Sequence, residues 1–535
     1  MTASALRQSI PALLIAVLVL VPFLGKAFTM DDTVFLFEAR HALTDPLHPL
    51  AFEMTWTYSP ERISRVVPTG PVMAWLLVPT VLAGGAEWVA HGTQLFLLCL
   101  SIVLTVSLAL RLGLAPRWAG AAGLLLAATP AVLGMAGTAM PDVPSMALGV
   151  AAVDQLVAWR QTRRVLPGVL GALFLGLAPM ARPHVLLLFG VGALFLAEDA
   201  FAPRAWLAGP WSRWAPLAAG LLVTVAIAAI TGDPGASGGN PAGAAMVFSS
   251  AKTIPRNLVA FSIHWVLALP LALPWVALRW REILLRPWTL LVATAAAAVL
   301  MRAAHGSEAP YALAPVAGLG AAVLVDLLAD AVRRRDGAQL ALLAWLLIAL
   351  PAAIYVHLPA KYLVASAPAA AILVARRLAE APRLRTAVLV ATVLLGLGLG
   401  VAILRADATF AGLGREAARA LIVPQVAAGK RVWYVGHWGF QWYAERAGGR
   451  YFNVTPPHPQ PGDLIVSCVN CEPSLELKEM AEVAHLGRTE DRTPGGRVMS
   501  KEAGAGFFSN AWGYLPWAWG HDVIDAFDVW VARPR

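Results

Sequence analysis

Long apolar segments recur along the first 405 residues of the chain and constrain its fold more than any other feature. Short polar breaks separate them, and most approach the roughly 20 residues that an α-helix needs to cross a bilayer. The composition is 58% hydrophobic and 14% charged, with a mean hydropathy of +0.66, which fits a polytopic membrane protein and excludes an ordinary soluble enzyme. We predict about thirteen spans, near residues 10–28, 93–110, 118–136, 143–159, 166–180, 183–197, 215–231, 258–278, 288–302, 311–332, 338–356, 362–375 and 386–404.

The distribution of arginine predicts the topology. With a cytoplasmic N-terminus, every basic cluster between the spans falls on the cytoplasmic side. Pro68–Gly84 is apolar but begins Pro-Thr-Gly-Pro, and it must then be an interfacial or re-entrant helix, because one more crossing would invert the charge bias. The net charge of +9 therefore reflects topology and not nucleic-acid binding. The clusters are Arg111/Arg117, Arg160/Arg163/Arg164, Arg204/Arg213, Arg279/Arg281/Arg286, Arg333/Arg334/Arg335 and Arg376/Arg377/Arg383/Arg385. A Gly/Ser/Pro-rich stretch, 233–257, predicts a mobile outer loop.

The chain changes character after Arg405, where helices alternate with strands and predict a small α/β domain. An odd number of spans places this domain, residues 406–535, outside the cytoplasm, and leaves 1–405 as an all-α membrane domain. Cys468 and Cys471 form a C-x-x-C there, which predicts either a short-loop disulfide or two free thiols. The predicted helices are 413–429 and 438–447, and the predicted strands are 431–436, 463–467 and 527–532. An aromatic run, 507–519, could pack on the fold, lie at the bilayer interface or line a sugar site.

Acidic residues lie at the outer ends of two distant segments. Asp31 and Asp32 open the first outer loop, 29–92, directly after the first span, and Asp142 lies between two prolines before another span. Acids at helix starts are favoured by the helix dipole, so each could be a simple N-cap. The predicted topology, however, brings all three to the same membrane face, where they could act together.

Cationic and aromatic residues are predicted at that same outer face. They are Arg65, Arg182, Arg256, His357, Lys361 and Tyr362. Lys361 could snorkel from the end of its span, or it could bind an anion. Carboxylates beside several separated cations suit a reaction that deprotonates an acceptor while a phosphate leaves, because the cations stabilise the growing negative charge.

In chain order, these residues resemble motifs of the membrane-embedded GT-C glycosyltransferases, in the branch of the protein O-mannosyltransferases and the lipid A aminoarabinose transferase. The likeness covers residues 10–380. Asp32 stands where many members have Glu, and Pro68-Thr69-Gly70-Pro71 replaces the usual Lys-Pro-Pro or His-Pro-Pro. The matching motifs are Asp31-Asp32, Met140-Pro141-Asp142-Val143-Pro144, Met180-Ala181-Arg182-Pro183 (with Arg182 in place of Lys), Arg256 before Leu273-Pro274-Trp275, and Lys361-Tyr362-Leu363.

The resemblance implies a GT-C fold and an inverting sugar transfer from a polyprenyl-phosphate donor to a lipid, glycan or protein acceptor at the extracytoplasmic face of a bacterial inner membrane. It implies that Asp31 is a general base or a metal ligand and that Asp32 belongs to the same catalytic site. Asp142 would help to position the acceptor or the metal. The cationic and aromatic residues named above (Arg65, Arg182, Arg256, His357, Lys361 and Tyr362) would hold the donor phosphate. Asp31 and Asp142 could bind Mg²⁺ or Mn²⁺, although proton transfer alone explains them equally well. A lipid-linked sugar flippase and a non-catalytic assembly subunit remain alternatives.

Overall fold

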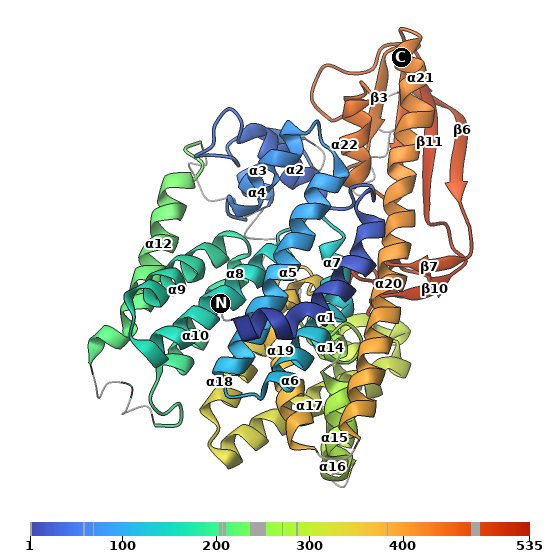
Figure 1. Ribbon diagram of the computed structural model, residues 1–535. Helices are drawn as coiled ribbons and strands as arrows, with labels where there is room; N and C mark the ends of the chain where they lie inside the picture. The colour runs from blue at the N-terminus through green and yellow to red at the C-terminus, as the bar shows by residue number, and fades with distance from the viewer. Residues whose placement is uncertain are drawn as a thin grey trace.

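The computed structural model describes the chain except for residues 1–2, 57–58, 68, 203–205, 207–209, 236–252, 270, 285–286, 382–383, 472–481 and 535. A body of helices carries a smaller, strand-containing domain at one end (Figure 1). Most of the predicted mobile loop at 233–257 lies outside the described residues.

The first half of the helical body runs from the N-terminus to residue 231. Within it, α6 and α7 form a pair bent by 59° at the Ala128-Thr129-Pro130 break, where proline cannot continue the preceding helix. Its helices are α1 (Ala3–Leu20), η1 (Val21–Phe23), α5 (Glu87–Arg111), α6 (Pro116–Ala127), α7 (Pro130–Ala136), α8 (Asp142–Thr162), α9 (Val165–Leu177), η2 (Ala178–Met180), η3 (Pro183–Leu187), α10 (Leu188–Leu196), η4 (Trp211–Trp214) and α12 (Ala215–Thr231).

The second half follows the undescribed stretch and ends in one long helix. These elements are α14 (Thr253–Leu267), α15 (Ala272–Leu284), α16 (Pro287–His305), η5 (Gly306–Glu308), η6 (Tyr311–Leu313), α17 (Ala314–Arg334), α18 (Gly337–Leu346), η7 (Leu347–Ile354), η8 (Ala360–Ser366), α19 (Ala367–Glu380) and α20 (Arg385–Ala417). Every predicted apolar segment falls on one of these helices or on a bent pair. In the described part of the chain, eight helices are long and apolar enough to cross a membrane, or ten if each bent pair is one span. The figure of thirteen crossings stays a prediction.

The first outer loop folds over the end of the body. It contains α2 (Asp32–His41), β1 (Glu53–Thr55), β2 (Pro60–Arg62), α3 (Ile63–Val66) and α4 (Val72–Leu82), with β1 and β2 antiparallel. The predicted interfacial or re-entrant segment corresponds to α4, whose 11 residues are too few to cross a bilayer; Pro68 lies outside the described residues. α4 packs against α2.

One continuous helix joins the body to the C-terminal domain. α20 continues through η9 (Ala418–Ile422) into α21 (Val423–Ala427), a run of 43 residues that Figure 1 shows rising to the C-terminal sheet. The predicted boundary at residue 405 therefore lies inside this helix, and the separate helix predicted at 413–429 is its upper part. One uninterrupted helix therefore connects the helical body to the C-terminal domain.

The C-terminal domain is built on a five-stranded mixed sheet of order β4-β3-β5-β11-β6. β3 is parallel to β4 and β5, whereas β11 is antiparallel to β5 and β6. The three predicted strands and the predicted helix 438–447 are confirmed; β4 and β6, the two edge strands of the sheet, were not predicted. The elements are β3 (Val432–Val435), α22 (Trp438–Arg446), β4 (Arg450–Tyr451), β5 (Leu464–Cys468), β6 (Val483–Asp491), β7 (Gly495–Arg497), β8 (Met499–Ser500), β9 (Ala505–Gly506), β10 (Ala518–Gly520) and β11 (Asp525–Ala532).

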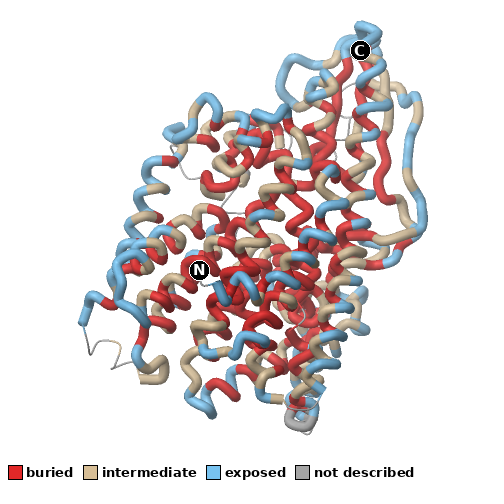
Figure 2. Tube along the Cα trace, in the orientation of Figure 1, coloured by how far each residue is buried: buried red, intermediate tan, exposed pale blue. Residues whose placement is uncertain are grey.

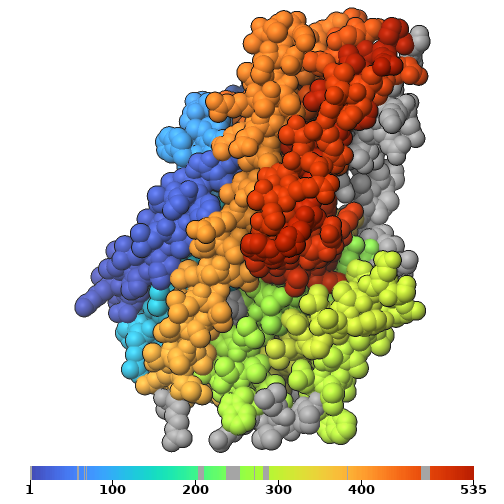
Figure 3. All heavy atoms as spheres, turned by 90° about the vertical axis from the view of Figure 1, so that its right-hand side faces the viewer, coloured from blue at the N-terminus to red at the C-terminus, as the bar shows by residue number. Residues whose placement is uncertain are grey.

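The C-terminal domain also packs along the side of the body. Tyr514 and His305 of α16 form a hydrogen bond of 2.7 Å, and Figure 3 shows the red-orange C-terminal residues lying against α20 and above the green-yellow helices. The aromatic run at 507–519 contributes to this packing, since Phe507 and Phe508 are buried. Cys468 and Cys471 form a disulfide, which decides between the two predicted states of the pair.

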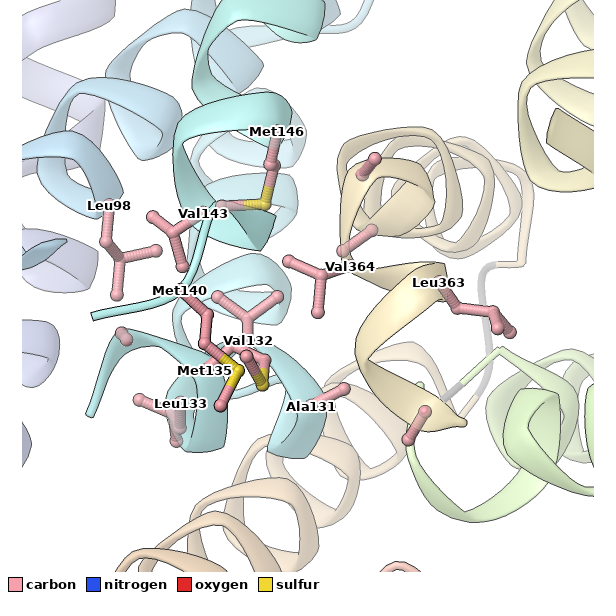
Figure 4. Close-up of a cluster of buried hydrophobic side chains, with 14 of the residues drawn as sticks. Leu98, Ala131, Val132, Leu133, Met135, Met140, Val143, Met146, Leu363 and Val364 are labelled. Atoms are coloured by element: carbon pink, nitrogen blue, oxygen red, sulfur yellow. The ribbon is translucent and has the colours of Figure 1, made fainter. Parts of the chain in front are cut away.

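The core lies in the centre of the helical body, where buried residues gather and exposed ones keep to the outer helices (Figure 2). Figure 4 shows Val364 of η8 facing apolar side chains of α7 and α8, among them Val132, Val143 and Met146. This packing fixes the start of α8 beside η8. As a result, Asp142 and Lys361 are carried on elements whose positions the core sets.

Candidate active site

Asp31 and Lys361 form an ion pair, although 330 residues separate them. The Lys361 Nζ donates to Asp31 Oδ2 at 2.9 Å; the lysine side chain is 4% exposed and that of Asp31 is 32% exposed. Burial tends to raise the pKa of Asp31, but the Lys361 ammonium outweighs it and holds that pKa below its usual value. Asp31 is therefore an ionised carboxylate with one side accessible, and Lys361 does not snorkel.

Asp32 turns the other way. Its carboxylate is fully buried and accepts hydrogen bonds from the backbone amides of Thr29 (2.9 Å) and Ala139 (2.8 Å). Burial raises the pKa of Asp32 to about 7. Asp32 thus ties the start of α2 to the loop before α8, and its carboxylate does not face the same partners as that of Asp31.

Asp142 and Arg182 form the second ion pair. Arg182 donates through Nε (3.1 Å) and one terminal nitrogen (2.7 Å) to the two oxygens of Asp142, the fork geometry that suits a guanidinium and a carboxylate. Asp142 opens α8 after Pro141, as expected from its flanking prolines. The first outer loop closes over this region, because a Cβ on Gly70 would lie 2.3 Å from the carbonyl oxygen of Met180.

Tyr362 joins the two pairs. The Arg182 guanidinium lies 5.3 Å from the centre of the Tyr362 ring and the Lys361 Nζ lies 6.0 Å from it. The carboxylates of Asp31 and Asp142 both act electrostatically on the Tyr362 hydroxyl. The two predicted acidic sites and the predicted Lys-Tyr turn therefore converge on one cluster.

His357 borders the cluster in its neutral form. Its Nε2 lies 3.2 Å from the Tyr362 hydroxyl, and its Nδ1 lies 3.1 Å from the Ser509 hydroxyl of the C-terminal domain. Burial, reinforced by the positive charge of Lys361, lowers the pKa of His357 to about 3. The neighbouring amide of Leu358 donates to Asn510 at 2.9 Å, so the C-terminal domain holds this turn.

Two predicted cations have other surroundings. Arg256, on α14, donates to the carbonyl of Val356 and acts electrostatically on His357, so it lies at the margin of the cluster. Arg65 is exposed on α3, and no ion pair joins it to a described residue. In the same loop, Arg62 pairs instead with Asp233 at the end of α12.

A further buried ion pair, Lys26 with Asp407, was not predicted. Lys26 donates to Asp407 of α20 at 2.7 Å, and each side chain is 1% exposed. The Thr29 hydroxyl donates to the other oxygen of Asp407 at 3.0 Å. Because 381 residues separate the partners, no spacing pattern could have linked them. The available signal was an acid that closely follows a long apolar run of one helix, because a carboxylate is expensive to bury unless it is paired.

The carboxylates of the cluster are balanced by cations and not gathered as metal ligands. Within the described residues, the group of three that could hold a metal ion is Cys468, Cys471 and Asp525, whose cysteines are joined in a disulfide. Asp31 and Asp142 each have a lysine or arginine partner instead. The donor set therefore fits anion binding and proton transfer better than a divalent cation.

The chain is similar to solved structures of membrane enzymes. ArnT from Cupriavidus metallidurans bound to undecaprenyl phosphate is 16% identical with a TM-score of 0.48, and the match covers 91% of this chain and 97% of that one. ArnT from the same organism in the apo state is 17% identical with a TM-score of 0.46, and the match covers 89% of this chain and 95% of that one. An oligosaccharyltransferase from Archaeoglobus fulgidus in complex with Zn and sulfate is 13% identical with a TM-score of 0.44. The match covers 83% of this chain and 62% of that one.

No protein-family model and no curated protein sequence matches the chain. ArnT and the oligosaccharyltransferase are both GT-C enzymes, the class that the sequence motifs resemble. At these identities and TM-scores the likeness carries no conclusion about the reaction of this chain, which has to be inferred from the site itself.

Proposed function

We propose that this chain is an inverting glycosyltransferase that moves a sugar from a polyprenyl-phosphate donor to an acceptor at the extracytoplasmic membrane face. The observation that carries the proposal is the pairing of Asp31 with Lys361 beside the Asp142–Arg182 pair, on elements from four distant parts of the chain. A partly exposed carboxylate next to buried cations provides both functions that the reaction needs: a proton acceptor and a stabiliser of the leaving phosphate.

Lys361 is the group that links the two functions. When a donor phosphate enters, its negative charge competes with Asp31 for the Lys361 ammonium. Loss of its cationic partner raises the proton affinity of Asp31, so donor binding itself makes the carboxylate a better base. Asp31 then takes the proton of the acceptor hydroxyl while the acceptor oxygen attacks the anomeric carbon of the donor sugar. The bond between that carbon and the phosphate oxygen breaks, and polyprenyl phosphate leaves.

Arg182 and Tyr362 assist at the phosphate side. Arg182 keeps its fork on Asp142 and presents the remaining guanidinium surface to the cluster, while Tyr362 offers a hydroxyl that His357 orients. Asp142 thus acts through Arg182. Asp32 is a positioning residue, because its oxygens hold the backbone amides of Thr29 and Ala139 and so fix the turn that presents Asp31.

Two observations support an extracytoplasmic site. The Cys468–Cys471 disulfide lies in the domain that covers the cluster, and disulfides persist in oxidising compartments outside the cytoplasm. The predicted cytoplasmic loops also meet one another, because Arg111, Arg160 and Arg335 line one cavity of about 760 Å³. Its lining contains no residue of the Asp31 cluster.

The test uses the purified full-length chain in lipid nanodiscs. Polyprenyl phosphates carrying different sugars are supplied with a lipid, a glycan and a peptide acceptor, and mass spectrometry detects released polyprenyl phosphate. The wild-type protein should release polyprenyl phosphate from one of the donors. Asp31→Asn should lower the rate of this release by about 10²–10⁴-fold, the usual contribution of a general base. An arm with EDTA should retain activity, because the proposed steps use no metal.

Asp45→Asn is the matched control, since Asp45 is an aspartate of the same outer loop that pairs with His48. It should keep wild-type turnover. If the purified protein moved intact sugar-linked lipid between liposome leaflets and released no polyprenyl phosphate, it would be a flippase and the transferase proposal would be wrong. Normal turnover by Asp31→Asn would remove the base role.

A further inference from the structure

A strained turn of the C-terminal domain lies beside Asp31. The turn is Gly436-His437-Trp438, between β3 and α22. Gly436 has φ +122° and Trp438 has φ +59°, and the left-handed region disfavours a residue with a side chain. Such backbone conformations persist where surrounding contacts enforce them, and they gather at binding sites.

Several contacts fasten this turn to the first outer loop. The Thr33 hydroxyl donates to the carbonyl of Trp438. A Cβ on Gly439 would lie 2.0 Å from the carbonyl oxygen of Phe28, so α22 begins directly against the segment that precedes Asp31. Gln441 donates to the carbonyl of Thr55 at 3.1 Å, which holds the residue next to Trp56.

These contacts place a buried imidazole with an unused nitrogen. His437 is 5% exposed, and its Nδ1 has no hydrogen-bond partner within the described part of the chain. The imidazole lies 4.4 Å from the Trp56 ring, centre to centre, with an angle of 38° between the planes. A buried polar atom without a partner is costly, so a ligand that supplies the missing hydrogen bond would gain from it.

The two histidines near Asp31 have different charged neighbours. Lys361, Arg256 and Arg182 act electrostatically on His357. At His437 the charge that acts is the carboxylate of Asp31. The cations therefore act at His357, whereas the pair of His437 and Trp56 offers an uncharged imidazole and an indole.

We propose that His437 and Trp56 bind the sugar ring of the polyprenyl-phosphate donor, and that this sugar is uncharged. The inference rests on the proposed function. With the donor phosphate at Lys361, the partner of Asp31, the attached sugar would reach past Asp31 to His437 and Trp56. There the imidazole nitrogen hydrogen-bonds a sugar hydroxyl, and the partly exposed indole covers the C–H face of the ring. The ammonium of an amino sugar would pair with the Asp31 carboxylate and neutralise the base that the reaction needs, and neither His437 nor Trp56 offers it another negative charge.

The experiment separates the sugar from its carrier. Wild type and His437 variants of the full-length chain, in nanodiscs, are titrated with bare polyprenyl phosphate and with polyprenyl-phosphate glucose, galactose, mannose, arabinose and 4-amino-arabinose. Wild type should bind one uncharged-sugar donor more tightly than the bare carrier. His437→Ala and His437→Phe should reduce the ratio of donor affinity to bare-carrier affinity by about three- to tenfold, the contribution of one hydrogen bond. The affinity for the bare carrier should stay unchanged.

His437→Gln, which retains a hydrogen-bonding amide, should restore part of the ratio, and His485→Ala, on the exposed β6, should keep all of it. An equal loss for donor and bare carrier would show a structural role and overturn the proposal, as would an unchanged ratio. Selective binding of the amino-sugar donor alone would also overturn it. If wild type bound neither carrier nor donor, the proposed function itself would fail.

Discussion

Two lysine–aspartate pairs lie close together in this fold and differ in access. Lys26 and Asp407 are each 1% exposed and share Thr29 as a further donor. Lys361 is also buried, with 4% of its side chain exposed, but the side chain of its partner Asp31 is 32% exposed. A closed pair can only hold elements together, whereas a pair open on the carboxylate side can exchange its partner with a ligand. The comparison separates a structural ion pair from a functional one.

Breaking the closed pair should have the largest effect. Lys26→Ala leaves the Asp407 carboxylate buried without its cation, which costs about 3–5 kcal/mol. We expect a large drop in thermal unfolding temperature and in the yield of folded protein. The double variant Lys26→Met/Asp407→Leu should recover much of the loss, because replacing a buried pair by apolar groups is often neutral. A single variant as stable as wild type would show that the pair is not closed.

Breaking the open pair should instead affect the ligand. Lys361→Ala should weaken binding of bare polyprenyl phosphate about tenfold or more, since a hydrogen bond between charged groups contributes about 1.5–3 kcal/mol. The unfolding temperature should fall less than in Lys26→Ala, because the Asp31 left behind can be hydrated. Lys430→Ala, at an exposed position shortly after α21, is the control. Unchanged carrier affinity would assign Lys361 a purely structural role.

The adjacent acids should contribute to stability with opposite signs as pH changes. The pKa of Asp31 is below its usual 3.8 in the folded state, so its contribution is present above that pH and is lost on acidification. The pKa of Asp32 is raised to about 7, so the unfolded chain releases this proton first and stability falls as pH rises from about 4 to 7. Unfolding temperatures of wild type and Asp32→Asn between pH 4 and 8 check this. The variant should show the flatter curve; parallel curves would contradict the shift.

Much of the site could be predicted from the sequence, because its residues stand at the ends of apolar segments. Segment length and arginine distribution placed Asp31, Asp142, Arg182 and Lys361 at one face, and the structure brings them into two adjoining ion pairs. The helices themselves follow from hydrophobic length. Arg65 was placed with them because it is in the same loop, but an exposed position on a loop does not fix the direction of a side chain.

The remaining features depend on contacts that leave no local pattern. The pairing of Lys26 with Asp407 needs α20 to pass beside the end of α1, and His437 is placed by positive φ angles at neighbouring residues. The division into domains at residue 405 stays a prediction, but no helix ends there: polarity rises at this position while the helix continues into α21. A rise in polarity therefore does not by itself mark the end of a helix.

The measurement that tests the central claim most directly is the affinity of bare polyprenyl phosphate for Asp31→Asn compared with wild type. If Asp31 and the donor phosphate compete for Lys361, the substitution frees the ammonium and removes a negative charge. The affinity should therefore rise about three- to tenfold while sugar transfer is lost. An unchanged or lower affinity in a folded Asp31→Asn protein would contradict the shared use of Lys361.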